Sequence, residues 1–167
     1  ADAGAELALT YQIEALEKLK KELEAHTGLK VSMGAEACDE AFKVYRAKRI
    51  GVITPYWPVG DKNVQRFFEE SGYEVRRIVG LKCLSPVLIA HVTPRQLREA
   101  FRAVDGDDVD LLVQVGTNLA CGKVAAAAEE WLGKPVIAIN AAIYWHALRA
   151  HGITDKVTGW GNLLAED

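Results

Sequence analysis

The sequence predicts an α/β fold, a doubly wound parallel sheet with helices on both faces. Two observations carry this prediction. Four units repeat one order, in which a β-branched run is followed by a turn and then by a helix with its own start and stop signals. The runs expected to form strands are almost entirely apolar, which is typical of strands that helices cover on both sides. Right-handed crossovers between such strands produce the doubly wound arrangement.

The first 47 residues predict two helices separated by a weak strand. The first helix is expected from Glu6 to Thr27, with Gly28 as its stop, because apolar residues recur there at helical spacing. This apolar stripe consists of Leu9, Ile13, Leu16, Leu19 and Leu23. The weak strand is expected over Leu29–Ser32, and the second helix near Glu36–Ala47.

The first two strands of the repeating units are expected over Arg49–Thr54 and Tyr73–Val79. The helix between them is expected over about Asn63–Ser71, with Asp61 as its N-cap and Gly72 as its stop.

A long link from Gly80 to Val92 has no regular period, and we expect it to form a loop that lies over the functional site. The next helix has clear signals: Thr93 suits the N-cap, Pro94 the first helical position, and Gly106 lies beyond the end.

The last two units predict strands over Asp110–Val115 and Pro135–Asn140. An alanine-rich helix is expected to begin near Thr117 and to end at Leu132, before Gly133. The helix after the last strand covers about Tyr144–Ala150, before Gly152.

Composition excludes several functional classes. Twenty basic and 23 acidic residues give a net charge of −3, without the basic excess typical of nucleic-acid binding. No apolar run approaches the roughly 20 residues of a transmembrane helix, and no secretory signal is visible. The three cysteines and four histidines have no metal-binding spacing. We therefore expect a cytoplasmic protein that binds neither nucleic acid nor membrane and contains no metal.

Nucleotide binding is also disfavoured. No Gly-x-Gly-x-x-Gly follows a strand, so the dinucleotide signature is missing. The stretch from Gly116 to Val124 resembles a phosphate loop, but it is one residue too long and ends in valine where a magnesium-binding hydroxyl is required.

Polar and small residues follow three of the predicted strands. These clusters are Thr54-Pro55-Tyr56, Gly116-Thr117-Asn118 and Asn140-Ala141-Ala142. Ligands of open α/β sheets bind beyond the carboxyl ends of the strands, and a helix starting near Thr117 would direct its free N–H groups to this place. The pattern predicts a site for a small carboxylate. The alternative is that Thr117 and Asn118 are ordinary helix caps.

Cys121 is the cysteine nearest this expected site. A helix N-terminus favours the thiolate, whereas free cysteines are commonly small buried hydrophobes. We expect it inside the helix, more than one turn from the loop, so packing is the preferred interpretation. A catalytic role for Cys121 remains the alternative.

Several segments together resemble the maleate isomerase and arylmalonate decarboxylase group of the aspartate/glutamate racemase superfamily. They include Arg49-Ile-Gly-Val-Ile-Thr-Pro-Tyr56, Asn63-Val64 and Gly72-Tyr-Glu-Val75. The match continues through Leu111–Asn140, Tyr144–Arg149 and Gly159-Trp-Gly-Asn-Leu-Leu164.

The resemblance implies two similar α/β halves with the site in the cleft between them. Residues 1–33 would then supply a helix and a strand of a largely absent N-terminal half, and residues 34–167 would form the C-terminal domain with a closing helix. The family's two cysteine positions correspond to Gly116 and to the region near Gly4, and neither carries a thiol in this sequence.

The resemblance also implies cofactor-free chemistry on a small dicarboxylate, with Tyr56 contacting one carboxylate and Thr117 and Asn118 contacting the second. The expected substrate-binding residues are Thr54, Tyr56, Asn63, Gly116, Thr117 and Asn118, and the catalytic candidates are Tyr56 and Cys121. Maleate-type isomerisation is the expected reaction. Arylmalonate-type decarboxylation, amino-acid racemisation, an inactive carboxylate-binding module and a homo-oligomeric state stay open.

Overall fold

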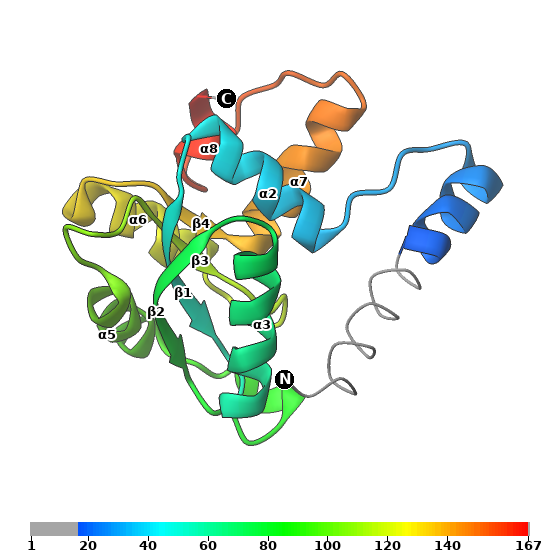
Figure 1. The fold of residues 1–167 in the computed structure, drawn as a ribbon. Coiled ribbons are helices and arrows are strands. Elements are labelled where there is room, and N and C mark those ends of the chain that lie inside the picture. The colour runs from blue at the N-terminus through cyan, green and yellow to red at the C-terminus, as the bar shows by residue number, and fades with distance from the viewer. Residues whose placement is uncertain (1–16, 167) are drawn as a thin grey trace.

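Four parallel strands form the central sheet of the computed structural model, which describes residues 17–166 (Figure 1). The strand order is β2-β1-β3-β4, and every neighbouring pair is parallel. The strands are β1 (Arg49–Thr54), β2 (Glu74–Gly80), β3 (Leu111–Gln114) and β4 (Val136–Ala138). The predicted parallel α/β sheet is therefore confirmed.

Helices cover both faces of this sheet, as predicted. One face packs against α2 (Gly34–Val44), α3 (Pro58–Glu70), α7 (Ile139–Ala150) and α8 (Asn162–Glu166). The other face packs against α5 (Pro94–Val104) and α6 (Gly122–Leu132). The short helix α4 (Pro86–Ile89) lies in the link after β2, and a helix over residues 17–27 precedes α2.

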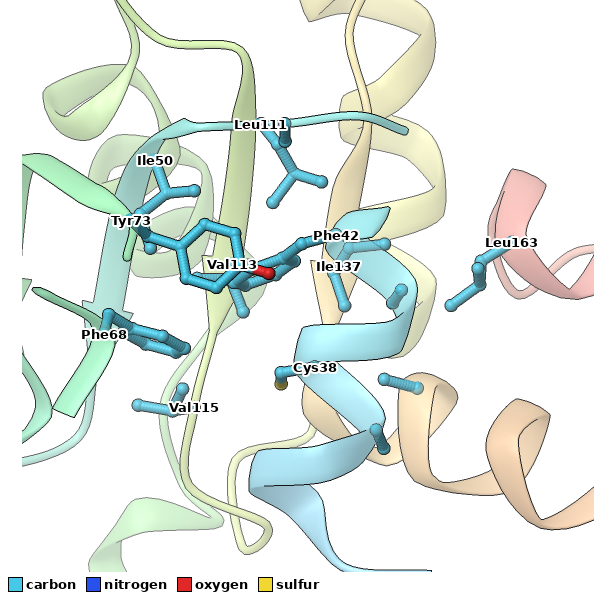
Figure 2. Packing of buried hydrophobic residues seen from close by; sticks show 14 of the residues in the cluster. Cys38, Phe42, Ile50, Phe68, Tyr73, Leu111, Val113, Val115, Ile137 and Leu163 are labelled. Carbon is cyan, nitrogen blue, oxygen red and sulfur yellow. The ribbon is translucent and has the colours of Figure 1, made fainter. Parts of the chain in front are cut away.

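The larger hydrophobic core lies between the sheet and α2. Figure 2 shows Phe42 of α2 beside Val113 and Ile137 of the sheet, with Phe68 and Tyr73 close by. Phe42 contacts the Tyr73 ring edge-on, with the ring centroids 5.0 Å apart, a favourable aromatic geometry. Packing in this core holds α2 and α3 against the sheet. It thereby also holds the ends of the strands that these helices cover.

The start and stop signals explain most boundaries. Thr93 forms a complete capping box with Gln96 at the start of α5, as its sequence predicts. Gly28, Gly72, Gly133 and Gly152 have positive φ at the ends of their helices, which confirms them as stops. No helix within residues 17–166 is long and apolar enough to cross a membrane.

Four local predictions are wrong. Residues 29–32 form no strand; the segment is held instead by single contacts, such as Val31 N–H with Glu24 and the Ser32 hydroxyl with His146. Helix α3 begins at Pro58 rather than Asn63, because proline at the first helical position starts it earlier. The predicted N-cap Asp61 is consequently inside the first turn of α3.

The other two differences lie after β3 and β4. Helix α6 begins at Gly122, not near Thr117, and residues 116–121 form a turn instead. Strand β4 ends at Ala138 and passes directly into α7, which begins at Ile139 rather than near Tyr144, so Asn140 lies in the first turn of that helix. Residues Leu9, Ile13 and Leu16 of the predicted stripe, and Gly4, lie outside the described residues.

Candidate functional site

The carboxyl ends of β1 and β3 lie side by side, so two of the predicted clusters come together. The N–H of Val115 donates to the carbonyl of Ile53 at 2.9 Å, which extends the pairing by one residue beyond the end of β3. A β-carbon built on Gly116 would lie 3.6 Å from the Tyr56 hydroxyl oxygen. The Tyr56 phenol and the start of the loop 116–118 therefore border the same space.

Thr54 is fully buried and holds the turn that carries Tyr56. Its hydroxyl donates to Oδ1 of Asp61 and accepts the N–H of Tyr56 at 3.0 Å. The hydroxyl of Thr54 is thus engaged within the protein, and Asp61, predicted as a helix cap, instead anchors this turn. The Tyr56 side chain is 37% exposed, and its hydroxyl has no hydrogen-bond partner among residues 17–166.

Gly116 has a backbone conformation and surroundings that require glycine. Its φ is +95°, and an added β-carbon would lie 2.6 Å from Cγ of Pro55. A residue with a side chain would therefore be strained and would collide with the neighbouring turn. The close approach therefore leaves no space for a side chain at position 116.

The loop 116–118 presents unused backbone donors. The carbonyl of Gly116 accepts the N–H of Leu119 at 3.1 Å, which closes the turn. Within residues 17–166, nothing accepts a hydrogen bond from the N–H groups of Gly116, Thr117 or Asn118. Adjacent backbone N–H groups of this kind can bind an anion. The turn, rather than a helix N-terminus as predicted, supplies the donors.

The link after β2 lies against both turns. The side-chain amide of Asn118 donates to the carbonyl of Pro86 in α4 at 3.3 Å, and the indole N–H of Trp57 donates to the carbonyl of Cys83 at 3.0 Å. The link that was predicted to form a loop over the site therefore contains a short helix and contacts the site's residues. Asn118 accordingly positions α4 with the same side chain that was predicted to bind substrate.

Two side-chain amides support the loop from behind: that of Gln114, which the sequence analysis does not single out, and that of Asn140, which belongs to the third predicted cluster. Gln114, the last residue of β3, donates to the carbonyls of Val115 and Gly116 at 2.6 and 2.9 Å. Asn140 of α7 donates to the carbonyl of Thr117 at 2.9 Å. The one available sequence signal for Gln114 is an amide inside an otherwise apolar strand.

Asn63 lies in the second turn of α3. It lines a largely apolar cavity of about 560 Å³ between α2 and α3, whose walls include Phe67, Phe68 and Val115. Tyr56, Thr117 and Asn118 are not among the cavity's lining residues. The structure thus brings Thr54, Tyr56 and the loop 116–118 together, and Asn63 lines a cavity whose wall includes Val115, the residue before that loop.

Cys121 lies at the N-cap position of α6, rather than inside the helix as predicted, and is almost fully buried. Burial raises the pKa of its thiol to about 12, which opposes the effect of a helix N-terminus on a thiolate. Within residues 17–166, no group of three or more histidine, cysteine or acidic side chains could hold a metal ion.

The comparison with protein families identifies the family of this chain. A family model described as "Arylmalonate decarboxylase" matches residues 4–164, almost the whole chain. The chain belongs to the arylmalonate decarboxylase family. The family resemblance expected from the sequence is therefore confirmed.

Curated maleate isomerases are relatives of this family member. The maleate isomerase of Pseudomonas putida is 29% identical over 136 residues, which are 81% of this chain and 54% of the relative. The maleate isomerase of Alcaligenes faecalis is 24% identical over the same length and the same shares of both chains. The chain thus spans about half the length of these relatives.

Solved structures show the same fold. The maleate cis-trans isomerase of Nocardia farcinica bound to TRIS has a TM-score of 0.85 at 25% identity, with 92% of this chain and 64% of that chain covered. A maleate isomerase variant from Pseudomonas putida S16, solved with maleate, has a TM-score of 0.82 at 26% identity. The match covers 89% of this chain and 60% of that chain. A crystal structure of arylmalonate decarboxylase has a TM-score of 0.78 at 22% identity, with 90% of this chain and 68% of that chain covered.

Proposed function

We propose that the protein is a cofactor-independent isomerase of the maleate cis–trans type that acts on small dicarboxylates. The observation that carries the proposal is the row of three backbone N–H groups without acceptors at 116–118, next to the Tyr56 phenol. Donors of this kind bind a carboxylate and stabilise the negative charge that develops in an enediolate-like intermediate. The relatedness to maleate isomerases supports the choice of substrate.

In this proposal Tyr56 and the loop have distinct roles. The Tyr56 hydroxyl donates a hydrogen bond to a substrate carboxylate, and the loop N–H groups bind carboxylate oxygens at the β3 end. Thr54 acts by fixing the Tyr56 backbone, because its hydroxyl is already engaged. Gly116 packs closely against Pro55 and supplies no thiol. The reacting nucleophile or proton donor then comes either from Cys121 or from a second α/β half of the kind that the family resemblance implies.

Cys121 remains a catalytic candidate within the proposal, although its burial and raised pKa favour the packing interpretation. Asn63 is retained as a substrate-binding candidate only for a ligand that extends into the cavity lined by Phe67 and Phe68.

Arylmalonate-type decarboxylation is the second candidate, because the matching family model has that description and the reaction needs the same carboxylate donors. Racemisation of acidic amino acids would use the same donors as well. An inactive carboxylate-binding module is the alternative from another class.

Incubation of the full-length protein in D₂O separates these functions. Maleate, phenylmalonate, aspartate and glutamate are added singly, and products and deuterium incorporation are followed by proton NMR. Conversion of maleate to fumarate supports the proposal, whereas loss of CO₂ from phenylmalonate identifies the decarboxylase. Exchange at the α-carbon of aspartate or glutamate identifies a racemase. Carboxylate binding without product or exchange identifies the binding module and contradicts the proposed activity.

A further inference from the structure

Side-chain amides hold the loop 116–118 through hydrogen bonds to its backbone carbonyls and to that of Val115. Three consecutive carbonyls, those of Val115, Gly116 and Thr117, each accept a hydrogen bond from a side-chain amide. Gln114 supplies the first two of these bonds and Asn140 the third. The donors come from β3 and α7, so two separate elements hold one short loop.

Because the peptide bond is planar, the hydrogen bonds to these carbonyls also orient the N–H groups of the loop. In a trans peptide the carbonyl and the N–H of the next residue point in opposite directions. Holding the carbonyl of Val115 therefore directs the N–H of Gly116 to the other side, and the same relation links the next two carbonyls to Thr117 and Asn118. The three N–H groups directed in this way are the three that have no acceptor within residues 17–166.

The buried side chain of Gln114 lowers the stability of the fold, which indicates a role other than packing. It is fully buried, and its Oε1 accepts no hydrogen bond from the described residues. A buried polar atom without a partner destabilises a protein. The neighbouring carbonyls also fix the amide orientation, because the opposite orientation would place Oε1 against two carbonyl oxygens. Leu112, two residues earlier on the same face of β3, shows that an apolar side chain suits this environment.

We propose that Gln114 and Asn140 are positioning residues that fix the peptide planes of the loop 116–118 for carboxylate binding. This inference rests on the proposed function for its ligand, and its structural part stands independently of that function. Binding is strengthened because the donors are oriented before the ligand arrives, so that no ordering of the loop accompanies binding.

Two variants test the proposal in the full-length protein. Gln114→Met removes both amide donors at similar side-chain length, and Asn140→Leu removes the third on an exposed side chain that the fold does not need for its core. Leu112→Val is the matched control for Gln114→Met, because it perturbs the same buried face of β3 without touching the loop. Asn162→Leu, an exposed asparagine of α8, is the control for Asn140→Leu.

The first measurement needs no ligand. Backbone amide resonances of residues 116–118 are compared by ¹H–¹⁵N NMR in the parent, the variants and the controls. We expect exchange broadening or doubled peaks at these residues in both positioning variants and single sharp peaks in both controls. Unchanged loop resonances in Gln114→Met and Asn140→Leu would overturn the proposal.

The second measurement is the dissociation constant for maleate, with phenylmalonate as a second probe. We expect each positioning variant to bind about tenfold more weakly than the parent, while the controls bind like the parent. Parent-like affinity in both positioning variants would overturn the proposal. If the parent binds neither acid but the variants disturb the loop resonances, the proposed function fails and the positioning role stands.

Discussion

Substitution of Gly116 by alanine tests the close approach between the two turns of the site. The φ of +95° strains any residue with a side chain by about 1–2 kcal/mol. The added β-carbon would also lie 2.6 Å from Cγ of Pro55, and relieving such overpacking costs about 1–3 kcal/mol. We therefore expect Gly116→Ala to lower the free energy of unfolding by about 2–5 kcal/mol.

Gly72→Ala is the matched control for this experiment. Gly72 has a φ of +87°, but an added β-carbon there would meet nothing within 4 Å. The backbone strain and the loss of unfolded-state entropy are then nearly the same in both variants, and only Gly116→Ala adds the collision with Pro55.

The free energies of unfolding are measured by urea denaturation, with linear extrapolation to water. The expected difference between the two variants is about 1–3 kcal/mol, the overpacking part alone. Equal destabilisation by both substitutions would refute the close approach. It would also remove the steric reason for glycine at this position.

Three further predictions concern the site and the sheet. Tyr56→Phe should weaken maleate binding by about 1–3 kcal/mol in calorimetric titration, and parent-like binding by this variant would place the site elsewhere. Iodoacetamide should label Cys121 slowly near neutral pH and at a rate that maleate does not change, because burial raises its pKa to about 12. The Arg49 side chain lowers the pKa of Asp110 to about 2, so this stabilisation is present above pH ~4 and is lost as the pH falls towards 2. Arg49→Gln should therefore raise the pH at which acid unfolding occurs, followed by circular dichroism, whereas an unchanged midpoint would contradict this linkage.

The strands and most helix ends could be predicted because their signals are local. The first strand matches β1 residue for residue, since Arg49–Thr54 is a β-branched run bounded by a proline turn. Helix α5 begins where Thr93 and Pro94 indicate, and Gln96 completes the capping box. In such segments the cap, the proline and the hydrophobic pattern all favour the same boundary.

The wrong predictions lie where the same residue types favour two different local structures. Thr117 and Asn118 have the side chains of helix caps, but the structure uses them in a turn that closes through Leu119. The same chemistry favours caps and turns, so composition alone does not separate the two. Leu29–Ser32 alternates apolar and polar residues as a half-buried strand does, but it pairs with no strand of the described sheet.

The correction at α6 changes the physical origin of the proposed anion site. In a helix N-terminus the free N–H groups are oriented by the helix itself, and the macrodipole adds to their attraction. Because α6 begins at Gly122, the donors at 116–118 belong to a turn and lack this built-in support. Their orientation then depends on contacts from outside the turn, which the amides of Gln114 and Asn140 supply. The unpartnered Oε1 of the buried Gln114 lowers the stability of the sheet, while the amide group of the same side chain orients the donors of the proposed site before a ligand binds.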